Sequence, residues 1–377
     1  MINKKRKVLF VTGEASGDAY ASQIILVLNS INTSVSYYAI GGEMLKNAGA
    51  NILFNYLSIQ AFGFLQAIKK YWKITNILKK VCRWIELENP DVIILVDNWG
   101  FNSLLAKHIK KKTSIKIFYI IPPKVWAWNI SRVAQLNKIS DCVAVIFPFE
   151  VSLLSTLGCD NVFYAGNPLL EIYQLESIQL NQRNENRVII GLIPGSRKSE
   201  VDLHLPLLNE VVDRYFKKNI DSQVDFIIPC DVSIKSIYES VLVHPRIKIL
   251  YGKFSSIVQK CNICVTASGT ASLEVALCLI PQIVFYKSGF VDSLILRKIL
   301  TTQSISLPNI LLSQKYIPEL IFENATSSSI LSHLSELLAN KFAQSTQVEL
   351  SKSLYSILQS DSLFSKQCAN QIKLFLS

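Results

Sequence analysis

The 377-residue sequence lacks an apolar run long enough to span a membrane. Its most apolar stretch, Val275–Tyr286, is interrupted by Pro281 and Gln282. It falls short of the ~18–20 residues that a membrane-spanning helix needs. Charged residues are also scarce, at 18%, while 50% of the residues are hydrophobic. This composition excludes disorder, collagen and coiled coil, and leaves a buried α/β core, a protein of the membrane surface, or both.

Several ligand-binding signatures are missing as well. No Gly-x-Gly-x-x-Gly follows a strand and no P-loop is present, which argues against an NAD enzyme and a P-loop NTPase. There is no Asp-x-Asp pair, so we expect no metal and no cofactor in catalysis. Cys261 and Cys264 form a lone Cys-x-x-Cys without further ligands at metal spacing, and we expect neither metal nor redox chemistry there. The four histidines are also interpreted as structural or solvated: His108, His204, His244 and His333.

The net charge of +11 is distributed unevenly. Residues 1–165 hold 19 basic and 10 acidic side chains, whereas residues 166–377 hold 20 and 18. A basic, apolar-rich half attracts anionic surfaces, either phospholipid head groups or nucleic acid. The chain shows no aromatic-and-basic stacking platform and no recognisable nucleic-acid-binding motif, which argues against nucleic acid. The eight scattered cysteines and the absence of a signal peptide predict reduced thiols in the cytoplasm.

Apolar strand candidates alternate with helical patterns, which is typical of parallel sheets covered by helices. A polar stretch at residues 174–187 separates two such series. The sequence therefore predicts an N-terminal Rossmann-like domain over 1–166, a second over 167–345 and a C-terminal helical segment over 346–377. The expected strands are Lys7–Thr12, Val35–Ile40, Val92–Val96, Ile115–Ile120, Cys142–Phe147, Val188–Ile193, Val224–Pro229, Ile247–Leu250, Ile263–Ala267 and Gln282–Tyr286.

Two motifs follow strands in the first series. Gly13–Asp18 places small residues before a helix, where free N–H groups favour anions, although a tight strand-to-helix turn explains it equally well. Val96–Asn102 places Asp97 at the end of a buried strand. Ligands bind beyond the carboxyl ends of parallel strands, so Asp97 is a candidate general base. A helix N-cap is the alternative interpretation of Asp97.

Two further motifs follow strands in the second series. Pro194–Glu200 combines a glycine turn with Arg197, whose guanidinium can grip a phosphate, although a surface turn with a solvated arginine is the alternative. Thr266–Glu274 opens a helix with Ser268, Gly269 and Thr270, whose hydroxyls and N–H groups suit a diphosphate. Glu274 lies one turn further on the same face and can accept hydrogen bonds from a ribose diol. Helix capping is the alternative here.

Taken in order along the chain, these motifs resemble those of lipid-A-disaccharide synthase, a family of glycosyltransferases. The resemblance covers most of the chain and rests on Gly13–Asp18, Gly41–Met44, Val96–Asn102, Val125–Trp128, Ile193–Val201, Ala267–Glu274 and Ser306–Asn309. It implies the GT-B architecture, an α/β fold of two doubly wound, Rossmann-like domains facing a central cleft. The second domain is then the UDP-sugar side, and the first is the acceptor and membrane side.

The resemblance also implies a reaction. UDP-2,3-diacylglucosamine gives its sugar to 2,3-diacylglucosamine 1-phosphate (lipid X), forming a β-1,6-linked disaccharide 1-phosphate and UDP with inversion. Asp97 is then the base, and Arg197 with the helix start at Ser268–Thr270 meets the charge of the leaving UDP. Further active-site candidates are Glu14, Ser16 and Asn309. The alternatives are another UDP-sugar enzyme of this fold, an epimerase or muropeptide glycosyltransferase, or a nucleic-acid-binding module.

The sequence departs from the family pattern in four places. Gly100 replaces a second aspartate and Asn167 replaces a histidine, while Pro122-Pro123 replaces Ser-Pro and Phe62–Gln66 lacks the usual glutamate. The oligomeric state and the preferred acyl chain length are not indicated by any of these residues.

The resemblance implies an enzyme on the inner face of the inner membrane of a Gram-negative bacterium, and membrane contact is expected through Ile59–Leu78. There, apolar side chains are interleaved with Lys69, Lys70 and Lys73. A core helix with a solvated lysine edge is the alternative interpretation of this segment.

Overall fold

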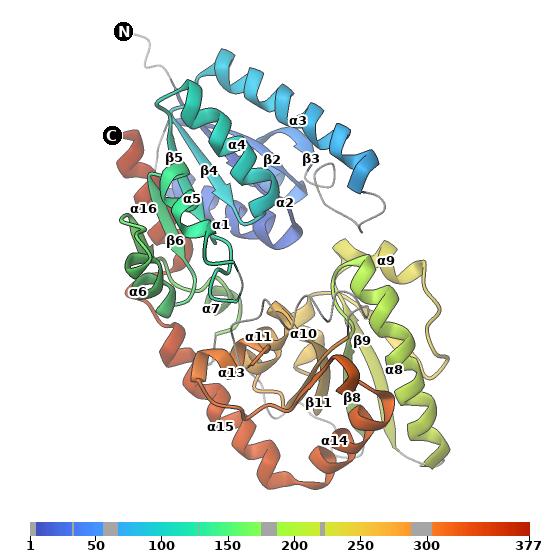
Figure 1. The fold of residues 1–377 in the computed structure, drawn as a ribbon. Helices are drawn as coiled ribbons and strands as arrows, with labels where there is room; N and C mark the ends of the chain where they lie inside the picture. The colour runs from blue at the N-terminus through green and yellow to red at the C-terminus, as the bar shows by residue number, and fades with distance from the viewer. Residues whose placement is uncertain are drawn as a thin grey trace. The chain divides into compact units, whose positions relative to one another are not determined.

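Two separate parallel sheets carry the fold, one in each of two units (Figure 1). The computed structural model describes residues 5–31, 34–55, 67–127, 129–174, 187–218, 223–287 and 304–377. The first unit comprises Met1–Glu171 and Leu358–Ser377, and the second comprises Ile172–Ile357. All ten strands expected from the sequence are present, with ends that shift by at most two residues.

The first unit contains a seven-stranded parallel sheet in the order β3-β2-β1-β4-β5-β6-β7. In chain order the strands are β1 (Arg6–Val11), β2 (Val35–Gly41), β3 (Asn51–Asn55), β4 (Val92–Val96), β5 (Lys116–Ile120), β6 (Cys142–Val145) and β7 (Val162–Tyr164). The helices are α1 (Ala15–Ser30), α2 (Glu43–Asn47), α3 (Ala67–Glu88), α4 (Trp99–Lys112), α5 (Arg132–Ile139), α6 (Phe149–Thr156), α7 (Leu169–Ile172) and α16 (Phe364–Leu376).

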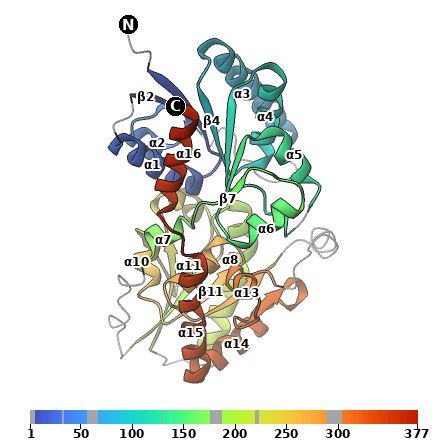
Figure 2. The ribbon, with the colours of Figure 1, turned by 90° about the vertical axis from the view of Figure 1, so that its left-hand side faces the viewer.

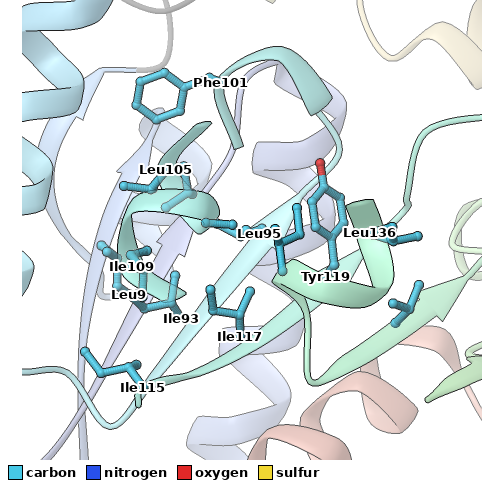
Figure 3. Close-up of a cluster of buried hydrophobic side chains, with 14 of the residues drawn as sticks. Leu9, Ile93, Leu95, Phe101, Leu105, Ile109, Ile115, Ile117, Tyr119 and Leu136 are labelled. Carbon is cyan, nitrogen blue, oxygen red and sulfur yellow. The ribbon is translucent and has the colours of Figure 1, made fainter. Parts of the chain in front are cut away.

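Both faces of this sheet are buried, because successive side chains of a strand point to opposite faces. In β1, Leu9 belongs to a cluster with α3, α4 and α5, whereas Phe10 belongs to a cluster with α1, α2 and α16. Figure 3 shows the first cluster, in which Ile93 and Leu95 of β4 pack among the side chains of α4. Near-continuous apolar strands are what a doubly covered parallel sheet requires.

The last residues of the chain are helical and return to the first unit. Leu358–Ser377 belongs to the first unit, and α16 lies along α1 (Figure 2). Phe364 and Ile372 are buried in the cluster that contains Phe10. The backbone N–H and hydroxyl of Ser365 donate to the carboxylate of Glu171, at 2.7 and 2.9 Å. The apolar stripe of α16 therefore covers one face of the first sheet.

The second unit contains a six-stranded parallel sheet in the order β10-β9-β8-β11-β12-β13. Its strands are β8 (Val188–Ile193), β9 (Val224–Cys230), β10 (Ile247–Tyr251), β11 (Ile263–Ala267), β12 (Gln282–Tyr286) and β13 (Glu319–Ile321). Its helices are α8 (Lys198–Lys218), η5 (Val232–Ile234), α9 (Lys235–Glu239), α10 (Phe254–Val258), α11 (Thr270–Leu277), α13 (Leu307–Leu312), η6 (Phe322–Asn324), α14 (Ser327–Ala339) and α15 (Lys341–Leu358). Helices α8 and α14 pack against one face of this sheet.

All eight cysteines are buried free thiols, which fits packing rather than disulfide chemistry. Among the helices of the described ranges, none is both long enough and apolar enough to cross a membrane.

Candidate active site

In the first sheet, two of the motifs meet where the strand order reverses. The chain runs from β1 outward to β2 on one side, and from β4 outward to β5 on the other. Open parallel sheets bind ligands outside the carboxyl ends of strands at this switch point. The loop with Glu14 leaves β1 there, and the loop with Asp97 leaves β4 beside it. Glu14 is half-buried and Ser16 is exposed.

The two loops are in direct contact. A Cβ atom placed on Gly13 would lie 2.0 Å from the side-chain nitrogen of Asn98, so no larger residue fits between the loops. Glycine is therefore required at position 13 by close approach. The tight-turn interpretation of Gly13–Asp18 therefore explains the glycine at position 13. The approach of Gly13 to Asn98 also brings the backbone of Glu14, the next residue, close to the loop of Asp97.

Asn98, and not Asp97, occupies the N-cap position of α4, the helix that follows β4. The side chain of Asn98 makes no capping hydrogen bond. Asp97 instead sits in a left-handed turn with a φ of 51°, and Asn98 follows with a φ of 40°. The backbone N–H of Asp97 donates to the carbonyl of Ile120 at 2.9 Å, which ties the turn to β5. Asp97 is half-buried, directly after the carboxyl end of β4.

Asp18, which the sequence analysis did not assign, joins two motifs of this unit. Its carboxylate accepts the N–H of Gly42 at 2.5 Å and the N–H of Met44 at 3.1 Å, at the start of α2. A Cβ on Gly41 would lie 3.0 Å from the same carboxylate. Burial raises the pKa of Asp18, against these hydrogen bonds. Asp18 of α1 thus caps the start of α2, and the Gly41–Met44 element supplies the N–H groups that it accepts.

A buried carboxyl group lies at the start of α6, the helix that follows β6. Glu150 accepts the indole N–H of Trp126 at 2.8 Å and the backbone N–H of Phe147 at 3.1 Å. Burial raises its pKa to about 7. The ring of Trp126 meets those of Phe147 and Phe149 edge-on, with centroids 6.3 and 5.5 Å away. The Val125–Trp128 motif, whose Trp128 lies outside the described residues, therefore packs around a carboxyl group that the sequence analysis missed.

In the second sheet, the other two motifs also meet at the switch point. The loop Pro194–Glu200 leaves β8, and Ser268–Thr270 leaves the adjacent strand β11. Gly269, with a φ of 155°, is the N-cap of α11, and both Gly269 and Thr270 are exposed. Ser268 is tied down, because its hydroxyl donates to the carbonyl of Ile305 at 2.9 Å. The exposed groups at this helix start are therefore Gly269 and Thr270 rather than the hydroxyl of Ser268.

Arg197 is exposed at the start of α8 and forms an ion pair with Glu200 at 3.2 Å. The carboxylate of Glu200 also accepts the N–H groups of Ser196 and Arg197, at 3.2 and 3.3 Å. Two backbone N–H groups and one guanidinium thus converge on one negatively charged group. A ligand anion that binds to these donors has to displace the carboxylate of Glu200 from them.

Glu274 lies one turn into α11 and contacts a residue from a distant part of the chain. The hydroxyl of Tyr173 donates to Oε2 of Glu274 at 2.5 Å. Burial raises the pKa of Glu274 to about 7, and the charge of Asp231 acts in the same direction. Tyr173 itself is buried, and no motif signals it, because it precedes the polar stretch interpreted as a linker.

Asn309 is placed differently from the other candidates, since its side chain is 1% exposed. The side-chain oxygen accepts the N–H groups of Tyr316 and Ile317, and the side-chain nitrogen donates to Glu319 and to the carbonyl of Ile317. Glu319 also accepts the hydroxyl of Ser306 at 2.7 Å. The Ser306–Asn309 element thus forms a buried polar cluster, and the contacts of Asn309 are those of a residue that holds a loop.

Comparison with known proteins identifies the family. The sequence model of lipid-A-disaccharide synthetase matches residues 8–373. The chain belongs to this family. A relative from Nitrosococcus oceani, named lipid-A-disaccharide synthase, is 31% identical over 358 residues, which are 92% of this chain and 90% of the relative. One of the same name from Syntrophus aciditrophicus is 32% identical over 340 residues, 88% of each chain. The expected resemblance is confirmed, and the protein is a glycosyltransferase enzyme of lipid A biosynthesis.

Solved structures share the fold at low sequence identity. The S. aureus MnaA–UDP co-structure has a TM-score of 0.66 at 12% identity and covers 98% of this chain and 97% of its own. UDP-GlcNAc 2-epimerase from Neisseria meningitidis bound to UDP-GlcNAc has a TM-score of 0.60 at 15% identity, with 98% of each chain covered. Acinetobacter baumannii MurG has a TM-score of 0.56 at 12% identity and covers 98% of this chain and 99% of its own. These neighbours confirm the predicted GT-B fold class.

Proposed function

We propose that the protein transfers the sugar of UDP-2,3-diacylglucosamine to the 6-hydroxyl of 2,3-diacylglucosamine 1-phosphate. The products are the β-1,6-linked disaccharide 1-phosphate and UDP. The observation that carries the proposal is that the four strand-end motifs gather in pairs at the two switch points. Asp97 and Glu14 share the first, and Arg197 and Gly269 share the second. Membership of the lipid-A-disaccharide synthetase family supports the choice of substrates.

Asp97 is the proposed general base. An α-linked donor that gives a β-linked product reacts by a single in-line displacement, which needs one base for the attacking hydroxyl. Asp97 lies where a parallel sheet binds ligands, and a neighbouring residue holds the helix N-cap position that would otherwise explain it. We assign Glu14 and Ser16 to the same ligand-binding site, at the carboxyl ends of β1 and β4.

The second unit is the proposed donor side. The diphosphate is expected at Arg197 and at the exposed start of α11, formed by Gly269 and Thr270, where N–H groups and a guanidinium stabilise the charge that develops on the leaving UDP. Ser268 contributes by holding this start in place. Glu274 is the proposed acceptor of hydrogen bonds from the ribose hydroxyls, and Asn309 holds the adjacent segment.

The decisive test is an assay of the purified protein with both lipid substrates, following release of UDP and formation of the disaccharide. UDP release that requires the acceptor supports the proposal. Conversion of the UDP-sugar without any acceptor would favour an epimerase instead. Transfer to a muropeptide but not to the lipid acceptor would favour the other glycosyltransferase of this fold.

We also propose that the protein works on the inner face of the inner membrane, because both substrates carry two acyl chains. Extracting such chains into water costs ~0.8 kcal/mol per CH₂ group, which docking on the bilayer avoids. The net charge of +9 over residues 1–165 supports attraction to anionic lipid. Within the segment Ile59–Leu78, residues 59–66 lie outside the described residues.

Liposome co-sedimentation tests the membrane proposal. Wild type is compared with a variant in which Phe62, Phe64 and Leu65 are changed to Ser. The wild type should bind anionic vesicles and the variant should bind them less. Equal binding would exclude this segment, and no binding by the wild type at physiological salt would exclude docking on the surface.

A further inference from the structure

Two buried hydrogen-bond donors converge on the backbone carbonyl of Asp97. The hydroxyl of Tyr119, on β5, donates to this carbonyl at 2.8 Å. The side-chain nitrogen of Asn102, on α4, donates to it at 2.8 Å and also approaches the carbonyl of Val96 at 3.3 Å. Tyr119 and Asn102 are each 0% exposed. Figure 3 shows the ring of Tyr119 among apolar side chains, with its hydroxyl at the margin of the cluster.

These donors hold a backbone conformation that is costly by itself. Asp97 and Asn98 are consecutive residues with positive φ, a region that L-residues enter at a cost even though Asp and Asn tolerate it best. Such conformations persist only where the surroundings determine them, and they concentrate at functional sites. Here the surroundings act from three elements: Tyr119 on β5, Asn102 on α4, and the close approach of Gly13 after β1.

The direction of the Asp97 side chain follows from this turn. The Cα–Cβ bond of a residue is set by its φ and ψ, so a residue held at positive φ aims its side chain differently from one that continues the strand. Burial raises the pKa of Tyr119, and the charge of the Asp97 carboxylate acts in the same direction. The negative charge of Asp97 therefore acts on the Tyr119 hydroxyl, which donates to the backbone carbonyl of Asp97.

We propose that Tyr119 and Asn102 are positioning residues, which fix the turn of Asp97 so that its carboxylate reaches the acceptor hydroxyl. The inference rests on the proposed role of Asp97 as general base. It assigns no contact with substrate to either residue. A displacement of about 1 Å at a reacting group can reduce the rate ~100-fold, so loss of one donor is expected to lower kcat tenfold to a hundredfold.

The test compares two tyrosine variants that lose the same kind of interaction. Tyr119→Phe removes the hydroxyl at Asp97, and Tyr164→Phe removes a hydroxyl that donates to the carbonyl of Leu358 in the same unit. We expect similar decreases in melting temperature for both variants. Only Tyr119→Phe should lower kcat, with the KM for the lipid acceptor and the affinity for UDP within about twofold of wild type, because positioning acts on the chemical step.

Two more variants complete the design. Asn102→Ala removes the second donor and should reproduce the loss of kcat, and it replaces Tyr119→Phe if that variant does not yield folded protein. Equal kcat in Tyr119→Phe, Asn102→Ala and Tyr164→Phe would overturn the positioning role. Asp97→Asn reports separately on the base itself: if it keeps wild-type turnover, the assignment of the base fails, and the inference fails with it.

Discussion

The hydroxyl of Tyr173 donates to Oε2 of Glu274 across 101 positions of the sequence, within the second unit. This contact joins the residue proposed to bind ribose with a side chain from the beginning of that unit. Burial raises the pKa of Glu274 to about 7, and the hydrogen bond from Tyr173 opposes this effect. The carboxyl group is therefore partly protonated near neutral pH before any ligand binds.

The affinity for UDP should consequently increase as the pH rises from 6 to 8. Ribose hydroxyls donate hydrogen bonds to the ionised carboxylate, so binding is weak where Glu274 is protonated and reaches its full strength above its pKa of about 7. Glu274→Gln should bind UDP more weakly at pH 8. Calorimetric titrations at several pH values check this.

The glutamine variant is also the control, because UDP itself loses a phosphate proton near pH 6. The difference in affinity between wild type and Glu274→Gln removes that contribution. A difference that stays constant from pH 6 to 8 would count against the ribose contact.

Asp97→Asn should nearly abolish turnover and leave UDP binding intact. The substitution keeps the shape and the tolerance for positive φ, but it removes the proton acceptor, and general-base catalysis contributes ~10²–10⁴-fold. Rates of UDP release with both lipids, measured beside UDP affinity, check this. Turnover within about threefold of wild type would mean that Asp97 is not the base.

Arg197→Ala should weaken UDP binding by about 10–100-fold, since a hydrogen bond to a charged group contributes ~1.5–3 kcal/mol. Arg214→Ala is a matched control on the same helix: Arg214 pairs with Glu210 as Arg197 pairs with Glu200, but near the other end of α8. Calorimetry should show an unchanged UDP affinity for the control. Equal losses in both variants would indicate a general effect of charge.

Asp18→Ala should lower the free energy of unfolding of the first unit by about 1–3 kcal/mol, because it leaves the N–H groups of Gly42 and Met44 at the start of α2 without their acceptor. Asp18→Asn retains one acceptor oxygen and should lose less. Urea denaturation followed by circular dichroism measures both. A neutral effect of Asp18→Ala would show that water replaces the cap.

Glu150 should make the stability of the first unit depend on pH. Its pKa is about 7 in the folded protein and near 4.3 when unfolded, so the folded state binds the proton more tightly. The contribution of Glu150 to stability is then fully present below about pH 4 and is lost as the pH rises through 7, by roughly 2–4 kcal/mol in all. Glu150→Gln cannot ionise and should lose this part of the pH dependence. Melting curves at pH 5.5 and 8 compare the two proteins, and parallel shifts would refute the assignment.

The interior strands and the strand-end motifs were predictable from the sequence, because burial on both faces demands continuous apolar runs and ligand-binding turns demand small residues. The three strands that the sequence analysis missed, β3, β7 and β13, are all sheet edges. An edge strand has one neighbour and less burial, so its apolar signal is weaker. The ten predicted strands include every interior one.

The tertiary structure alone decided which distant side chains meet. Tyr119 reads as an ordinary strand residue, and only the pairing of β4 with β5 brings its hydroxyl to the carbonyl of Asp97. Asn102 lies in the Val96–Asn102 motif and reaches the same carbonyl from five positions along the chain. Helix α16 reads as an amphipathic terminal helix, yet its apolar stripe packs on the first sheet. Local periodicity determines that a face is buried, whereas the partner of that face depends on contacts between residues far apart in the chain.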